Sequence, residues 1–213
     1  MRARNILYDW LRIDRAVAVP SSIAHHSGLC LMGGSPRVHD NLLWIAQVLA
    51  LTGSAVKENV PVIGHCLGGQ LLAKALGAEV SASPAAEIGW NHCEVENNRI
   101  ARDWFGDATS FPAFQWHFES FAIPNGATRV LHGANCPNQA FVLGIHYGSQ
   151  THIEVDENII RYWIEKDRVM LASLSEPGVQ TSEQILSNMA VKLPAMRRVT
   201  ERIYAKWVGS LLN

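Results

Sequence analysis

One stretch of the 213-residue sequence decides the fold: Pro61-Val62-Ile63-Gly64-His65-Cys66-Leu67-Gly68-Gly69-Gln70-Leu71-Leu72-Ala73-Lys74-Ala75-Leu76-Gly77. It begins with a short apolar run over residues 60–63, which is typical of a buried strand. A Gly-x-Cys-x-Gly turn follows, and apolar residues then recur at helical spacing over residues 71–76. Gly77 stands where a helix ends. The stretch therefore predicts a strand, a tight turn and a helix in succession.

The turn in this stretch has the pattern of a nucleophile elbow with Cys66 at its centre. Such a turn strains the backbone of its central residue, and Gly64 and Gly68 leave out side chains that would clash there. The thiol would lie at the N-terminus of the next helix, where an anion is favoured. The alternative is that Cys66 is a small core residue, as a lone cysteine after a buried strand usually is.

A second candidate site is the segment Gln150-Thr151-His152-Ile153-Glu154. If it forms a strand, residues 150, 152 and 154 share one face, because side chains alternate along a strand. A general base and the carboxylate that orients it need this relationship. His152 would take the proton of Cys66, and Glu154 would hold the imidazole tautomer. The alternative is that His152 is a core histidine with its hydrogen bonds satisfied.

The pattern Gly64-x-Cys66-x-Gly68-x-Gln70, followed by Leu71-Leu72-Ala73, resembles the class I glutamine amidotransferases. The chain is most similar to stand-alone domains related to the glutaminase half of GMP synthase, and the resemblance runs from about Tyr8 to the C-terminus. It implies an α/β fold, a flavodoxin-like three-layer sandwich whose mainly parallel central sheet has helices on both faces and a small antiparallel addition. It also implies that Cys66, His152 and Glu154 are the catalytic residues.

An acyl-transfer site needs N–H donors where the oxyanion forms. The N–H of Leu67, directly after the nucleophile, is one candidate. The run Met32-Gly33-Gly34-Ser35-Pro36 resembles the oxyanion loop of the family, which implies that Gly34 presents the second N–H. A plain turn after a strand is the alternative for this run.

The resemblance also implies substrate contacts outside the catalytic residues. Gln70, one helical turn past Cys66, would help to bind glutamine; a surface helix glutamine is the alternative. His117, within Phe114-Gln115-Trp116-His117-Phe118-Glu119-Ser120, is a candidate to contact the substrate or gate the site, and an aromatic cluster packed beside the sheet is the alternative. His65 is expected to point to the opposite side of the turn.

The chain departs from the family pattern in three places. The segment around His152 is commonly Gln-Phe-His-Pro-Glu in the family, whereas Thr151 and Ile153 replace its second and fourth residues here. Ser35 precedes Pro36 in the oxyanion loop, which shifts the match. The strand that usually opens such domains is expected to be missing, because a helical pattern begins at the start of the chain.

Composition limits the other classes of function. With 48% apolar and 17% charged residues and a net charge of −1, residues 1–213 are expected to form a single globular domain without a nucleic-acid or membrane surface. No apolar run is long enough for a membrane span or a signal peptide, so a cytoplasmic location is expected. The four cysteines form no Cys-x-x-Cys pair, and neither a metal nor a cofactor is expected.

Spacing predicts the remaining elements. Helices are expected over residues 1–15, 41–51, 156–166 with Asp156 as N-cap, 182–189 and 195–212, the last two divided by Pro194. Strands are expected at these places: residues 16–19, 28–32, 79–83, 93–95, 128–131 and the region of 138–141. Alternating strands and helices favour a parallel sheet.

The function expected from this pattern is hydrolysis of the glutamine side-chain amide through a thioester on Cys66. The ammonia would pass to a separate synthetase subunit, or the enzyme would act alone on γ-glutamyl peptides or amides. Two alternatives stay open: a catalytically silent regulatory or binding module on the same fold, and a cysteine-centred chaperone or peptidase of the flavodoxin-like group. A homodimer is left open as the oligomeric state.

Overall fold

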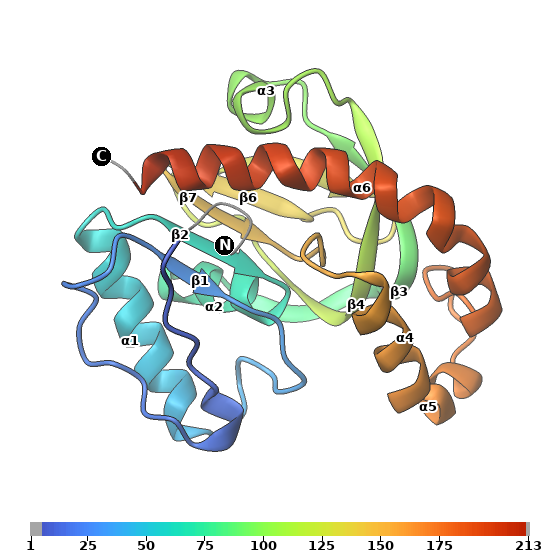
Figure 1. The fold of residues 1–213 in the computed structure, drawn as a ribbon, viewed down its shortest axis with the longest axis horizontal. Coiled ribbons are helices and arrows are strands. Elements are labelled where there is room, and N and C mark those ends of the chain that lie inside the picture. Colours follow the sequence, from blue (N-terminus) through green and yellow to red (C-terminus); the bar gives the residue numbers. More distant parts are fainter. Residues whose placement is uncertain (1–5, 212–213) are drawn as a thin grey trace.

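The computed structural model describes residues 6–211, and these form a layered α/β fold around a twisted sheet (Figure 1). Within that range the sheet has seven strands in the order β1-β2-β7-β6-β5-β3-β4. Their bounds are β1 Leu29–Leu31, β2 Val62–His65, β3 Val80–Val95, β4 Ser110–Phe121, β5 Thr128–Gly133, β6 Ala140–Leu143 and β7 His146–Ser149. The helices are η2 Ile13–Arg15, α1 Leu43–Lys57, α2 Leu67–Ala75, α3 Arg99–Phe105, α4 Glu157–Lys166, α5 Arg168–Ser173 and α6 Ser182–Ser210.

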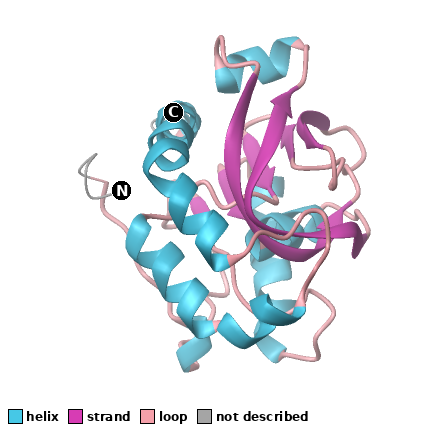
Figure 2. Cartoon of the chain, turned by 90° about the vertical axis from the view of Figure 1, so that its right-hand side faces the viewer, coloured by secondary structure: helices cyan, strands magenta, loops and turns pink. Residues whose placement is uncertain are grey.

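The sheet is mixed and has a parallel part and an antiparallel part. β1, β2 and β7 pair in parallel, and the pairs from β7 through β6, β5 and β3 to β4 are antiparallel. The predicted α/β class is confirmed, while the antiparallel part is larger than the small addition expected. Figure 2 shows its long strands as a strongly curved ribbon.

Two hydrophobic clusters cover the two faces of the sheet, as a three-layer sandwich requires. Val62 packs in a cluster with residues of α1 and α2, whereas its neighbour Ile63 packs in a cluster with residues of α4 and α6. Side chains alternate along a strand, so one buried strand supplies both cores. This explains why residues 60–63 have an uninterrupted apolar pattern.

Several predicted elements are confirmed. The strand and helix around Cys66 are β2 and α2, and the strand before the Gly33-Gly34 loop is β1. The Asp156 side chain caps α4 by accepting a hydrogen bond from the N–H of Ile159 at 2.9 Å. None of the described helices is both long and apolar enough to cross a bilayer.

The start of the chain differs from the prediction. A helix over residues 1–15 and a strand over 16–19 were expected, but residues 6–12 and 17–20 have no regular secondary structure, and residues 1–5 lie outside the described range. Leu7 and Trp10 are 98% and 61% exposed, so their helical spacing does not correspond to a buried face. Among residues 6–211 β1 is an edge strand of the sheet, and the opening strand of the family, which was expected to be missing, is not found there.

The end of the chain also differs, because Pro194 does not divide two helices. α6 is continuous from Ser182 to Ser210, and Leu212 of the predicted second helix lies outside the described residues. Pro194 removes one backbone hydrogen bond. The buried stripe nevertheless continues at helical spacing on both sides of it, through Met189, Leu193, Met196, Val199, Ile203 and Trp207. Packing of this stripe therefore outweighs the local effect of the proline.

Two further predictions are corrected in the middle of the chain. The strands expected at 79–83 and 93–95 are parts of the single strand β3, which pairs with β4 and has an irregular register between Ala82 and Glu87. The strand expected at 150–154 is absent: β7 ends at Ser149, and a bend and a turn follow.

Candidate active site

The segments of the candidate site meet at the carboxyl ends of the three parallel strands. The registers Leu31–Gly64 and Gly64–Gly148 place β1, β2 and β7 side by side. Because the strands are parallel, the residues that follow them emerge at the same edge of the sheet. These are the Gly33-Gly34 loop, the turn at Cys66 and the segment from Gln150 onward.

Cys66 has the strained backbone of a nucleophile elbow. Its φ is 50° and its ψ is −113°, a left-handed conformation that non-glycine residues rarely adopt. Its N–H donates to the carbonyl of Ser149 at 2.8 Å, and its own carbonyl accepts from the N–H of Gln70 at 2.9 Å. These bonds to β7 and within α2 hold the strained residue in place.

Two glycines permit the elbow to form. A Cβ at Gly68 would lie 2.1 Å from the carbonyl oxygen of Leu31, and a Cβ at Gly64 would lie 2.4 Å from the carbonyl oxygen of Gly68. Both obstacles are backbone atoms that cannot give way. The predicted reason for the Gly-x-Cys-x-Gly pattern is confirmed at both positions.

His152 and Glu154 form a close pair although they do not lie on a strand. His152 Nδ1 and Glu154 Oε1 are 2.7 Å apart. A turn brings the two side chains together, and the N–H of His152 is anchored to the carbonyl of Phe114 on β4 at 2.8 Å. The imidazole packs edge-on against Trp163 of α4, with ring centroids 4.7 Å apart.

Charge governs the protonation of this pair. Burial by itself would lower the pKa of His152, but the negative charges of Glu154 and Cys66 raise it to about 10. Burial would raise the pKa of Glu154, yet the positive charge of His152 holds it below its ordinary value. The pair is therefore an imidazolium and a carboxylate at neutral pH.

The imidazole also lies close to the elbow thiol. Cys66 is among the groups whose electrostatic interaction raises the pKa of the ring. A Cβ on Gly33 would lie 2.6 Å from His152 Cε1 and 3.5 Å from Cys66 Cβ, so all three residues are neighbours. We call Cys66, His152 and Glu154 the elbow group.

The two candidate oxyanion residues also lie together. Leu67 is the first residue of α2, whose leading N–H groups lack helical partners. A Cβ on Gly34 would lie 3.2 Å from Leu67 Cδ2, which places the loop after β1 against the start of α2. Donation by the Leu67 and Gly34 N–H groups to an oxyanion stays a prediction.

Gln70 is buried and joins a side-chain relay to the thiol. Its amide donates to the carbonyl of Glu119 at 3.0 Å and to Oε1 of Gln150 at 3.1 Å. The Gln150 amide in turn lies 3.5 Å from Cys66 Sγ. No role for Gln150 was expected from the sequence, although its place two residues before His152 was a usable signal.

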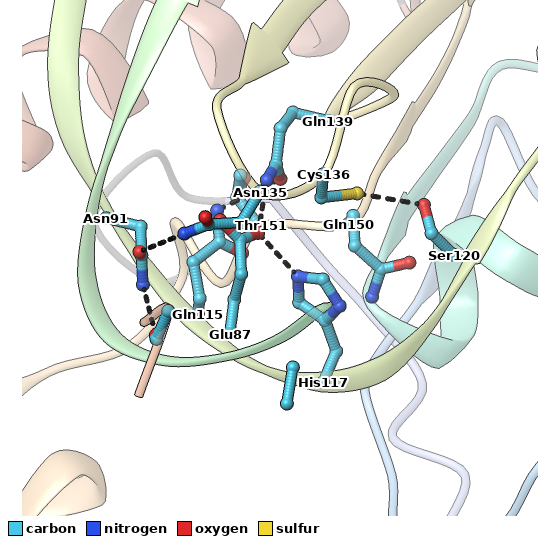
Figure 3. Close-up of polar contacts among 12 residues, drawn as sticks. Glu87, Asn91, Gln115, His117, Ser120, Asn135, Cys136, Gln139, Gln150 and Thr151 are labelled. Atoms are coloured by element: carbon cyan, nitrogen blue, oxygen red, sulfur yellow. Dashed lines mark hydrogen bonds and ion pairs between the residues drawn. The ribbon is translucent and has the colours of Figure 1, made fainter. Parts of the chain in front are cut away.

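His117 is buried and paired with a glutamate of the neighbouring strand β3. Its Nε2 is 3.0 Å from Glu87 Oε2, and both side chains are almost fully buried. Figure 3 shows Gln139 and Gln115 continuing this network; Gln139 donates to Glu87, and Gln115 donates to Gln139 at 2.9 Å. Contact of His117 with a substrate stays a prediction for a ring that the structure places in this network.

Cys136 completes a second group of the same residue types. One ligand atom each from Glu87, His117 and Cys136 lies within 4.8 Å of the others, the spacing of a potential metal site. The Cys136 thiol already contacts Ser120 Oγ at 3.1 Å, as Figure 3 shows. We call these three residues the sheet group; the expectation that the chain holds no metal stays a prediction.

Fold and site together define an α/β protein built around a nucleophile elbow whose cysteine faces a histidine–glutamate pair. The chain belongs to the glutamine amidotransferase class-I family, whose model matches residues 2–158.

The known proteins with similar sequences or structures include glutamine amidotransferases and GMP synthases. A crystal structure of a glutamine amidotransferase from Methylobacillus flagellatus is 40% identical and superposes with a TM-score of 0.95, covering 98% of this chain and 86% of the other. One from Thermotoga maritima is 26% identical with a TM-score of 0.85, covering 97% and 89%. The GMP synthase of Parasynechococcus marenigrum is 32% identical over 77% of this chain, which spans only 30% of that protein.

Proposed function

We propose that this protein hydrolyses the side-chain amide of glutamine, or the equivalent amide of a γ-glutamyl compound, through a thioester on Cys66. The observation that carries this proposal is the elbow group: a thiol on a strained turn, close to an imidazole that is paired with a buried carboxylate at 2.7 Å. A base and a fixed orienter next to a cysteine are the requirements of nucleophilic catalysis.

In the first step the sulfur of Cys66 attacks the carbonyl carbon of the substrate amide. Cysteine attacks as the thiolate, and the His152 imidazolium is its counter-ion. The carbonyl π electrons move to oxygen and form a tetrahedral oxyanion. We assign its stabilisation to the N–H groups of Leu67 and Gly34, because preorganised donors at this point are worth several kcal/mol.

The tetrahedral intermediate then collapses to the thioester. His152 donates its proton to the amide nitrogen, the carbon–nitrogen bond breaks, and ammonia leaves. The neutral imidazole next takes a proton from water, whose oxygen attacks the thioester carbonyl. Cleavage of the carbon–sulfur bond releases glutamate and restores the thiolate–imidazolium pair. Glu154 keeps Nδ1 of His152 protonated throughout, so that Nε2 faces the reacting atoms.

The wall of the substrate pocket is assigned to β4 and the glutamine relay. The Trp116 carbonyl lies 3.9 Å from Cys66 Sγ, so this strand runs past the nucleophile. Gln70 fixes the next part of the strand through the Glu119 carbonyl. His117 would support the same strand from behind through Glu87 rather than by touching the substrate.

The relatives suggest where the ammonia goes. One subunit of the glutamine-hydrolysing GMP synthase of Sulfolobus acidocaldarius is 36% identical over 46% of this chain, which spans 52% of that subunit. By analogy, a separate synthetase subunit would receive ammonia from this site. A self-contained γ-glutamyl hydrolase would use the same thioester and need no such partner.

A substrate panel tests the proposal. The purified protein is incubated with glutamine, γ-glutamyl dipeptides and γ-glutamyl amides, and the release of glutamate and ammonia is measured with C66A as the control. Release that depends on Cys66 supports the proposal, and the preferred substrate separates the two forms of it. Release that C66A retains would overturn it.

A glutamine-shaped electrophile, such as a diazoketone analogue, distinguishes an enzyme from a silent module. Peptide mass spectrometry should find the label on Cys66 in the wild type. A folded protein that neither turns over any γ-glutamyl compound nor takes the label would be a regulatory module on this fold.

A further inference from the structure

The elbow group has one atom that its own members do not satisfy. Glu154 uses Oε1 for His152, while its Oε2 is buried and has no hydrogen-bond partner. Buried polar atoms are almost always paired, and an unpaired one in a candidate site requires an explanation. The charged or polar group that faces Oε2 is Nδ1 of His65, at 3.8 Å.

His65 also has a buried atom without a hydrogen-bond partner. It is the last residue of β2, directly before Cys66, and its side chain is fully buried. Its Nδ1 also has no hydrogen-bond partner. Two buried, unpaired atoms of opposite hydrogen-bonding capacity therefore face each other, and such contacts in ligand-free sites often tighten when substrate binds.

The other nitrogen of His65 is already engaged by the C-terminal helix. Tyr204 of α6 places its hydroxyl 2.8 Å from His65 Nε2. Burial raises the pKa of Tyr204 well above its ordinary value, so the hydroxyl keeps its proton and can donate it. Burial also lowers the pKa of His65, so this imidazole is neutral.

These contacts select one tautomer of His65. If Tyr204 donates to Nε2, the single ring proton lies on Nδ1 and points at Glu154 Oε2. In the other tautomer a lone pair on Nδ1 would face the carboxylate oxygen, which is repulsive. α6 also reaches the same turn through Thr200, whose hydroxyl donates to the Ile153 carbonyl at 3.0 Å.

We propose that His65 is a positioning residue that holds the second oxygen of Glu154, and that Tyr204 sets its tautomer. Glu154 is thus held between two imidazoles. The C-terminal helix orients the base through Tyr204, although Tyr204 lies some fifty residues after His152 in the sequence. This inference rests on the proposed function, because it assigns His65 a task in the same reaction.

Two substitutions of His65 distinguish the roles of its two ring nitrogens. The amide of asparagine reaches the position of Nδ1, whereas the amide of glutamine reaches that of Nε2. H65N should keep the donor to Glu154 and a rate close to wild type. H65Q should lower kcat on the order of tenfold to a hundredfold with KM little changed, because a misplaced orienter costs about that much.

Matched variants control for the loss of a buried ring. H146Q removes another buried histidine on the neighbouring strand β7, whose Nδ1 accepts from the N–H of Val62 rather than contacting the elbow group. H146Q should leave kcat per folded molecule unchanged. Y204F should lower kcat by less than H65Q does, because it removes only the hydroxyl that selects the tautomer of His65. Equal kcat values for H65N and H65Q, or equal losses in H65Q and H146Q, would overturn the inference.

Nitrogen NMR of the His152 ring separates this inference from the proposed function. The shifts of both ring nitrogens should change in H65Q and be restored in H65N. If the wild type hydrolyses no γ-glutamyl compound, the proposed function fails, while these shifts still report the clamp on Glu154. Shifts that are identical in wild type and H65Q would overturn the positioning role even in an active enzyme.

Discussion

The elbow group and the sheet group contain the same three residue types in two different environments. In each, a histidine and a glutamate are paired at hydrogen-bonding distance, 2.7 Å in the elbow group and 3.0 Å in the sheet group, and a cysteine lies near. The elbow cysteine sits at the start of α2 with a φ of 50° and interacts electrostatically with its histidine. The sheet cysteine contacts a serine, and burial raises its pKa.

If the proposed function is correct, residue type alone does not make a nucleophile. A buried thiol without a positive partner stays neutral and unreactive, whereas in general a neighbouring imidazolium favours the thiolate, which is the form that attacks. In the sheet group two donors, His117 and Gln139, already occupy the same oxygen of Glu87. The sheet group thus joins β3 and β4 to the segment that leads into β6, whereas the proposed function requires the sulfur of the elbow group to meet a substrate.

The largest expected difference between the groups concerns their cysteines. C66A should lower turnover by about a thousandfold or more, because a nucleophile acts as a unit with its base. C136A should keep the wild-type turnover per folded molecule. Glutamate release is measured for both, with circular dichroism to confirm folding. A C136A enzyme as inactive as C66A would remove the distinction between the groups.

The next largest expected difference is between the losses of kcat when His152 or Glu154 is replaced. H152A removes proton transfer and should lower kcat by about a thousandfold. E154A leaves the base in place with a poorer orientation and should lower kcat by about a hundredfold. Steady-state kinetics at saturating substrate measure both. Equal losses would mean that Glu154 does more than orient the ring.

The histidine of the sheet group should matter for stability. H117L leaves Glu87 without its imidazole partner in the core, and breaking a buried pair costs about 3 kcal/mol or more of unfolding free energy. Urea denaturation measures this, and the KM of the folded fraction should stay near wild type. Unchanged stability with a raised KM would instead support direct substrate contact by His117.

The last expected effect is on the pH dependence of folding. The folded-state pKa of His152 is raised from 6.5 to about 10, so its contribution to stability is complete below pH 6.5 and is lost as pH rises toward 10. E154Q removes the charge that faces the ring and should flatten this loss. Urea midpoints at several pH values in this window, for wild type and E154Q, give the comparison. Parallel curves would contradict the assigned charge of the pair.

Local sequence was sufficient for the elbow. The strand, the turn and the helix around Cys66 depend on residues next to one another in the chain, and on glycines where a Cβ would meet backbone atoms 2.1 Å and 2.4 Å away. The Asp156 cap of α4 was predictable for the same reason. The pairing of His152 with Glu154 was also correctly expected, although a turn and not a strand produces it.

Local patterns were misleading where distant packing decides the structure. Pro194 predicted a break, yet the buried stripe of α6 keeps one helix across it. The spacing of Leu7 and Trp10 predicted a helix, but no core surface receives that face. In both cases the burial of apolar side chains, which a local window does not contain, outweighs the propensity of the segment.

By itself, the sequence determined which residue would be strained and which side chains had the chemistry of a nucleophile, a base and an orienting carboxylate, because these depend on residue type and short-range geometry. Only the tertiary structure decided which histidine–glutamate pair meets the thiol. That choice follows from the parallel neighbours β2 and β7, whose register Gly64–Gly148 brings the turn at Cys66 and the turn at His152 to one edge of the sheet. The same order of strands, together with α6, sets His65 and Tyr204 behind Glu154.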